Sequence, residues 1–158
     1  MSQKAPVRVP GTAIFMSRNP KGIPNTLLHN LKHNRVVHER VIFLTITTRE
    51  IPIVPDEERS AVEELGHGFF RVFLGYGFME DPNVPEALMQ VALPKPALNP
   101  LETTYFLGRE TLIASKRPGM ALWREELFAR MSRNERTATS FFHLPPNRVV
   151  ELGEQIEL

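Results

Sequence analysis

The sequence predicts an α/β fold, with a mixed, partly parallel sheet of about five strands and flanking helices. Segments typical of strands alternate with segments typical of helices, which is the order that defines this class. The run RVIFLTITT (40–48) is apolar or β-branched on both faces, as in a strand buried within a parallel sheet. Residues 11–48 are therefore predicted to form a β-α-β unit with a right-handed crossover. One domain is expected over residues 7–158, after an added start or linker at 1–6.

A short helix is predicted to follow the first strand. GTAIFMS (11–17) is an apolar strand, and NPKGIP (19–24) is a turn. Pro24 suits the first position of a helix, where its fixed φ is favourable and its missing N–H is not needed. The helix has a narrow apolar stripe, formed by Leu27, Leu28 and Leu31.

The middle of the chain is predicted to contain an acidic surface connector, a strand and a short helix. The connector (51–68) is bounded by prolines and is expected to hold a short strand or a helical turn. FFRVFLGYGF (69–78) is the next strand. DPNVPEALMQVAL (81–93) is a short helix, in which Asn83 is the candidate cap and Pro85 lies in the first turn.

The last third is predicted to add further strands and the strongest helix. TTYFLGRETLIAS (103–115) is either one strand kinked at Gly108 or two strands. The pattern PGMALWREELFARMSRN (118–134) is typical of an amphipathic helix. ATSFFHL (138–144) is expected to be a helical turn, and NRVVELGEQIEL (147–158) is expected to be a closing strand.

The composition argues against several classes of protein. The net charge of +1 provides no polybasic surface for a nucleic acid. The absence of cysteine excludes disulfides, thiolate metal ligands and cysteine nucleophiles. No stretch reaches the roughly 18 consecutive apolar residues of a membrane helix, and the start MSQKAPVRVPG lacks the apolar core of a signal peptide. The chain alone is expected to be soluble.

The segment HNLKHNRVVHER (29–40) contains three of the five histidines. His29 and His33 are four residues apart, which places them on one helix face, as in some zinc sites. A third ligand is missing nearby, and Lys32 and Arg35 would repel a cation. The simplest interpretation is that the two histidines border the core and form local hydrogen bonds.

An anion or nucleotide site is the other interpretation of this segment. Arginine binds phosphate through two parallel hydrogen bonds, and His33, Arg35 and His38 lie close together in the sequence. The segment LGRETLIASKRPG (107–119) adds three basic residues around an apolar strand, and Gly108 would allow a ligand or another backbone to approach. The three residues are Arg109, Lys116 and Arg117. They could equally form a contact with another domain, or be ordinary basic residues at the two ends of a strand.

Motifs of nucleotide hydrolysis and nucleophilic catalysis are missing. GHG (66–68) and GYG (75–77) do not continue into a phosphate-binding glycine pattern, so turns and backbone bends are predicted there. No G-x-S-x-G motif exists. Ser140 and His143 are three residues apart, but no acidic residue lies close to them in the sequence. The chain is therefore predicted not to be an enzyme.

Five stretches, taken together and in order, resemble the C-terminal cytoplasmic region of the KUP (HAK/KT) family of potassium uptake proteins. The resemblance extends over residues 7–158 and depends on no single motif. The stretches are VPGTAIFMS, GIPNTLLHNLKHNRVVHERVIFLTITT, GYGFMEDPNVPEAL, TTYFLGRETLIASKRPGMALWREELFARMSRN and ATSFFHLPPNRVVELGEQIEL.

The resemblance implies that a membrane-spanning part precedes this region in the whole protein. That protein would carry potassium, together with protons, across the bacterial inner membrane. The ion-binding and proton-coupling residues would lie in the membrane helices, so no catalytic residue, metal ligand or cofactor is expected in this chain. The implied partners are the protein's own transmembrane domain, a second copy in a homodimer, and cyclic di-AMP or another nucleotide. The implied location is the cytoplasmic face of the membrane.

Three functions follow from these observations. The first is a regulatory or assembly domain of a potassium transporter, which predicts no turnover. The second is a nucleotide-sensing domain within that transporter, which predicts saturable binding of a nucleotide such as cyclic di-AMP. The third is a metal-dependent hydrolase using His29 and His33, which predicts a stoichiometric metal ion.

Overall fold

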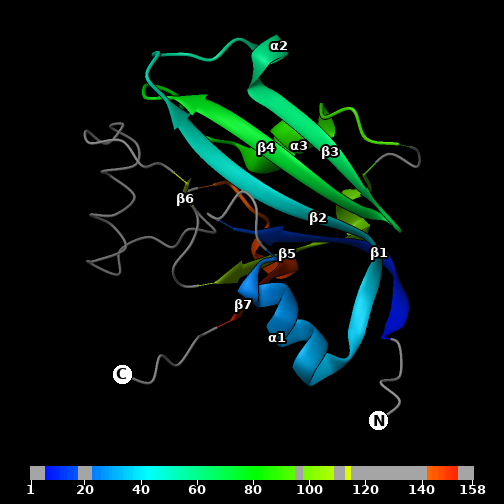
Figure 1. Cartoon of the computed structure of the whole chain (residues 1–158). Helices are drawn as coiled ribbons and strands as arrows, with labels where there is room; N and C mark the ends of the chain where they lie inside the picture. Colours follow the sequence, from blue (N-terminus) through cyan, green and yellow to red (C-terminus); the bar gives the residue numbers. More distant parts are fainter. Residues whose placement is uncertain (1–5, 18–22, 95–97, 109–112, 115–141, 153–158) are drawn as a thin grey trace, which may run out of the picture.

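The computed structural model describes residues 6–17, 23–94, 98–108, 113–114 and 142–152, and the structural statements below concern these residues (Figure 1). Three segments are α-helical: α1 (Asn25–Asn34), α2 (Asp56–Arg59) and α3 (Val84–Met89). Two are short 3-10 helices, η1 (Pro100–Glu102) and η2 (Pro146–Arg148). The strands are β1 (Val7–Met16), β2 (Val36–Arg49), β3 (Ser60–Gly66), β4 (Phe69–Gly77), β5 (Thr103–Gly108), β6 (Ile113–Ala114) and β7 (Val149–Leu152).

These strands form one mixed sheet, as predicted. Its order is β3-β4-β2-β1-β5-β7, and β6 pairs with β2. Only β3 and β4 pair in antiparallel fashion; the other described pairs are parallel. The sheet has seven strands rather than about five, because the connector (51–68) contributes β3 and the segment 103–115 divides into β5 and β6.

The predicted β-α-β unit is present, because β1 and β2 pair in parallel and α1 connects them. β2 is longer than predicted. It begins at Val36, which pairs with Val7, and it includes the polar residues His38 and Glu39. These residues precede the predicted strand (40–48). They are tolerated in β2 because the start of the strand forms a ribbon with β1 alone, outside the central sheet.

The two faces of the sheet are covered by different helices (Figure 1). Neighbouring residues of a strand point to opposite faces. One core therefore joins Leu27 of α1 to a set from β1, β2 and β5: Ala13, Phe15, Val41, Phe43 and Phe106. The opposite core joins α3 to another set, which includes Ile14, Ile42, Leu44, Val72 and Leu74. Residues 41–46 of β2 are all buried, which confirms that this strand is buried on both faces.

Helix α1 differs in detail from the prediction. Leu27 is buried and Leu31 packs against the same core, but Leu28 is exposed on the outer side of the helix. The inward face is completed by Thr26 and Asn30, which are both buried. Pro24 is the N-cap rather than the first residue of the helix, so the helix begins at Asn25, one residue later than predicted.

Helix α3 confirms the predicted cap. The side chain of Asn83 accepts a hydrogen bond from the Glu86 N–H at 3.2 Å, and Pro85 lies in the first turn. Val84, Ala87 and Leu88 are the buried residues of the helix. The predicted helix over 118–134 and most of the predicted turn over 138–144 lie outside the described residues.

Candidate functional site

The end of α1 is shaped by a reversal of the backbone. Arg35 adopts a left-handed conformation (φ 55°, ψ 32°), and its N–H donates to the Asn30 carbonyl at 3.2 Å. A residue in the left-handed conformation commonly ends a helix. The buried Asn30 amide donates to the Val36 carbonyl at 3.1 Å and so joins the helix to β2. The reversal leaves Lys32, His33 and Arg35 exposed, where positive charge also suits the helix C-terminus.

The two histidines proposed as metal ligands lie side by side. The rings of His29 and His33 are 6.1 Å apart and nearly parallel, at 8°. Within the described part of the chain, no three His, Asp or Glu side chains gather as they would around a metal ion. The third ligand that the hydrolase interpretation needs is therefore not provided by those residues.

His38 lies in a different environment from His33 and Arg35, which are both exposed. The His38 ring is half-buried and meets the edge of Phe106, with centroids 6.1 Å apart. Its Nδ1 is buried and has no hydrogen-bond partner among the residues described. Burial, and then the positive charge of Arg148, lower the pKa of His38, which disfavours the charged form that an anion would need. The role of these residues in anion binding stays a prediction.

The other candidates, Arg109, Lys116 and Arg117, lie outside the described residues. Arg8 is a further basic residue, and no sequence motif distinguishes it. Its guanidinium donates to the carbonyls of Glu39 at 3.0 Å and His67 at 2.7 Å, and it lies 5.4 Å from the centre of the Phe69 ring. His67 is 59 residues away in sequence, so only the folded register could reveal this contact.

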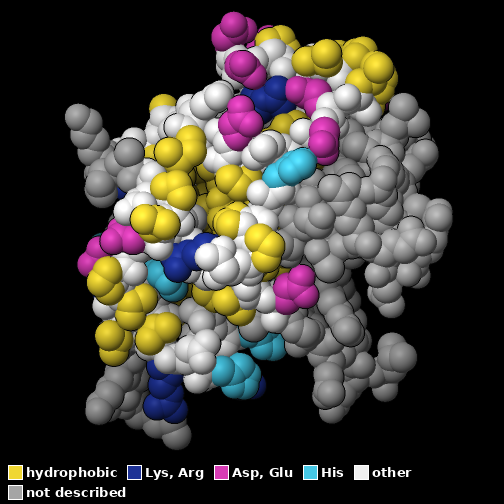
Figure 2. Space-filling model, turned by 180° about the vertical axis from the view of Figure 1, so that it is seen from behind, with side chains coloured by type: hydrophobic (Ala, Val, Ile, Leu, Met, Phe, Trp, Pro, Cys, Tyr) yellow, Lys and Arg dark blue, Asp and Glu magenta, His cyan; other side chains and the backbone are white. Residues whose placement is uncertain are grey.

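Arg8 belongs to a group of basic residues around the starts of β1, β2 and β5, which we call the basic end. Two members of the group also fix loops, because Arg40 donates to the Pro94 carbonyl at 2.9 Å and Arg148 donates to the Thr103 carbonyl at 2.8 Å. Figure 2 shows acidic side chains gathered mostly at the opposite, upper end of the molecule. The basic end comprises Arg8, Lys32, Arg35, Arg40 and Arg148.

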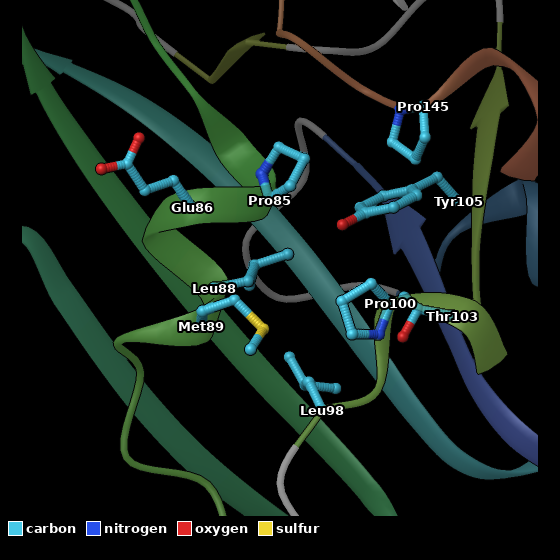
Figure 3. Close-up of a pocket in the computed structure, with 9 residues that line it drawn as sticks. All are labelled: Pro85, Glu86, Leu88, Met89, Leu98, Pro100, Thr103, Tyr105 and Pro145. Carbon is cyan, nitrogen blue, oxygen red and sulfur yellow. The ribbon is translucent and has the colours of Figure 1, made fainter.

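A small hollow lies on the α3 side of the sheet (Figure 3). It has a volume of about 190 Å³ and mainly apolar walls. The Tyr105 hydroxyl points into it, whereas the Glu86 carboxylate points away. Burial raises the pKa of Tyr105 to about 12, so the group stays a neutral hydroxyl. The hollow suits an apolar side chain rather than a reaction; its walls are Pro85, Glu86, Leu88, Met89, Leu98, Pro100, Thr103, Tyr105 and Pro145.

The structure also supplies an acidic partner for His143 that lies far from it in the sequence. His143 Nε2 lies 3.1 Å from a carboxylate oxygen of Asp81, which is 62 residues earlier. Ser140, which carries the nearby hydroxyl, lies outside the described residues. The contact joins the loop before α3 to the segment that follows residue 141, and both side chains are exposed.

Comparison with known proteins identifies the class to which this domain belongs. Residues 10–158 match the family described as "K+ potassium transporter C-terminal domain". This match identifies the chain as a C-terminal domain of a potassium transporter. The chain is 60% identical, over 97% of its length, to the probable potassium transport system protein Kup of Myxococcus xanthus. It is 53% identical over 96% of its length to Kup 2 of Rhizorhabdus wittichii. The chain belongs to the KUP family of potassium transporters, as the resemblance predicted.

The matched region is only part of these relatives. The chain covers 23% of the Myxococcus protein and 24% of the Rhizorhabdus protein, which is about a quarter of their length. The Kup protein of Anaeromyxobacter sp. (strain K), 54% identical, is covered to 23%. No solved structure matches the chain.

Proposed function

We propose that this chain is a regulatory and assembly domain of a bacterial Kup-type potassium transporter, positioned at the cytoplasmic face of the membrane. The observation that supports this most directly is the match to a transporter C-terminal domain over residues 10–158. No described helix is long and apolar enough to span a bilayer. The potassium and proton pathway would then belong to other parts of the transporter, and this domain would perform no turnover.

Self-association is part of this proposal. β3 lies at one edge of the sheet, and six of its seven residues are exposed. An exposed edge strand offers unpaired backbone groups to another chain. Glu63 and Glu64 in this strand limit uncontrolled pairing, because charges on an edge discourage aggregation. A second copy of the domain is the partner that we propose for the assembled transporter.

The proposal is tested in a bacterium that lacks its own potassium uptake systems. A transporter that carries this chain as its C-terminal region is compared with the same transporter lacking residues 7–158. We expect the truncated protein to support less growth at low potassium and to show less self-association after detergent extraction, at equal amounts in the membrane. Unchanged uptake and unchanged assembly under all potassium and pH conditions would contradict the proposal.

Nucleotide sensing is the second candidate function, and the sheet order supports it. β1 has β2 on one side and β5 on the other, and all three are parallel. After β1, the chain adds β2 and β4 on one side of this strand and later adds β5 and β7 on its other side. The order of the strands therefore reverses between β1 and β5. Ligands of open α/β sheets bind outside the carboxyl ends of strands at such a point. β5 ends at Gly108, and Arg109 is the next residue, so it is the first basic residue to test.

The sensing proposal predicts a thermal shift with one nucleotide. The chain is heated with AMP, ADP, ATP, cyclic di-AMP or cyclic di-GMP at fixed salt. A ligand at about 100 times its Kd stabilises the native state by about 2.7 kcal/mol, which is roughly 5–10 °C for a domain of this size. Arg109→Ala should reduce the shift. Arg35→Asn tests the other predicted arginine separately, because Arg35 precedes β2 and lies at the opposite end of the strands; a reduced shift in this variant alone would place the ligand beside α1 instead. A flat panel would rule out sensing of these nucleotides.

A further inference from the structure

Charge is distributed unequally along the long axis of the described part of the molecule. Strand β2 has 14 residues, which corresponds to roughly 40 Å if the strand were straight. Lys32 and Arg35 directly precede it, whereas Glu50 follows it. The acidic helix α2 lies at that far end, above β2 and β4 in Figure 1. The basic end and the acidic end are therefore separated by the length of the sheet.

The basic end is not balanced by an equal number of carboxylates. Glu39 and Glu102 are the acidic residues that directly adjoin its strands, at the start of β2 and just before β5. Glu63 and Glu64 lie on the neighbouring strand β3, opposite Arg71 and Phe70 near the start of β4. The five basic residues still exceed these four carboxylates, and Arg71 adds a further positive charge. At the far end the order is reversed, because Arg49 and Arg59 are outnumbered by Glu50, Asp56, Glu57, Glu58, Glu80 and Asp81.

The basic end also exposes apolar side chains. Val7 is 64% exposed at the first residue of β1, and Leu28 is 48% exposed on α1. Leu28 and Lys32 are four residues apart, so both lie on the outer face of the helix. Basic residues beside exposed aliphatic residues are typical of surfaces that bind the headgroup region of a membrane.

The chain enters the fold at this same end. The Val7 N–H donates to the Arg35 carbonyl at 3.1 Å, so the start of β1 is fixed beside the end of α1. The match is to a C-terminal domain, and the chain spans about a quarter of its relatives. The remaining part of such a transporter therefore joins this domain on the side of Val7, next to the basic residues.

We propose that the basic end docks on the anionic lipid surface of the bilayer, with Lys32, Arg35 and Arg8 toward the headgroups. This inference rests on the proposed function, because it needs a membrane part before Val7. A bilayer fits better than a single phosphate. The charged side chains are exposed on separate elements, α1 and β1, whereas a phosphate pocket needs donors that converge on one point.

Vesicle binding tests the inference with the 158-residue chain. Phosphatidylcholine vesicles, with or without phosphatidylglycerol, are sedimented with the protein at low salt. We expect binding only to the anionic vesicles and release as salt is raised, because screening weakens such contacts. Each basic residue at a membrane surface contributes about a fivefold change in affinity. Lys32→Gln should therefore weaken binding about fivefold, and Lys32→Gln with Arg35→Asn about 25-fold. Asparagine is chosen because it tolerates the left-handed conformation of position 35.

Arg49→Gln is the matched control, because it removes one exposed positive charge at the carboxyl end of β2. It should leave vesicle binding within about twofold. Equal binding to neutral vesicles, or equal losses in Lys32→Gln and Arg49→Gln, would overturn the inference. Release by inorganic phosphate beyond that by chloride at the same ionic strength would also overturn it and would indicate a site for a soluble anion. The uptake experiment above does not use vesicles, so a failure here is distinct from a failure of the proposed function.

Discussion

Replacing Glu80 by alanine is expected to lower the free energy of unfolding by about 3 kcal/mol, because it leaves a largely buried arginine without its partner. The side chains of Arg59 and Glu80 are only 15% and 14% exposed, and they form an ion pair. One Glu80 oxygen also accepts hydrogen bonds from the N–H groups of Gly77 at 2.7 Å and Val54 at 3.1 Å. Its loss would therefore leave the N–H groups of Gly77 and Val54 without this acceptor and Arg59 without its buried counter-charge.

Arg59 connects α2 and the preceding loop to the end of β4. It donates to the carbonyls of Val54 at 3.0 Å and Gly75 at 3.2 Å. Its guanidinium lies 4.6 Å from the centre of the Tyr76 ring, in the position of a cation–π contact. The pair with Glu80 thus holds the excursion between β2 and β3 against the sheet.

The effect of Glu80→Ala should depend on pH. Burial alone would raise the pKa of Glu80, but the hydrogen bonds from Arg59, Gly77 and Val54 outweigh it, and the pKa lies below its ordinary value of 4.5. A carboxyl group whose pKa is lower in the native state stabilises the fold above its unfolded pKa. That contribution is lost as the pH falls through the native pKa. The difference between the wild type and Glu80→Ala should therefore shrink below about pH 4.5.

Urea unfolding at neutral and acidic pH measures this difference. Asp56→Asn is the control, because Asp56 lies 3.5 Å from the same guanidinium but is 79% exposed. Exposed ion pairs contribute less than about 1 kcal/mol, so this variant should be close to the wild type. Equal destabilisation by the two variants would show that burial does not determine the strength of the Arg59 contacts.

The parts of the fold that depend on local sequence were predicted well. The run of apolar residues in β2 indicated burial on both faces, and Asn83 before Pro85 indicated the start of α3. Leu28 was assigned to the core stripe but is exposed, since the ribbon and sheet under α1 contact only the side that carries Leu27 and Leu31. A helical pattern of three leucines cannot show how wide the covering surface is.

The contacts that build the candidate sites join residues far apart in sequence. Arg8 reaches His67, and Asp81 reaches His143. Such pairs depend on strand order and register, which composition and periodicity do not determine. The acidic connector was predicted to hold a short strand or a helical turn, and it holds both α2 and β3. The bounds and pairing of β3 could not be predicted, because an edge strand exposed along most of its length has no apolar alternation by which to recognise it.

The second large loss of stability is expected when Gly68, in the turn between β3 and β4, is replaced by alanine. Gly66 and Gly68 both have positive φ, at 88° and 83°, which confirms that GHG (66–68) is a turn. A Cβ atom at Gly68 would lie 2.2 Å from the Glu39 carbonyl oxygen, whereas one at Gly66 would meet nothing within 4 Å. The two positions therefore share the backbone conformation but differ in the space around them.

Gly66→Ala should cost about 1–2 kcal/mol, which is the left-handed penalty alone. Gly68→Ala should cost at least about 2 kcal/mol more, a size typical of a forced backbone shift in a packed region. The Glu39 carbonyl cannot move freely, because it accepts from Arg8 and belongs to β2, and the Gly68 carbonyl accepts from the Val41 N–H at 2.8 Å. Urea unfolding of both variants measures the difference. Equal losses would show that the start of β2 can move away from the turn, and that the contacts of Arg8 do not hold the basic end in place.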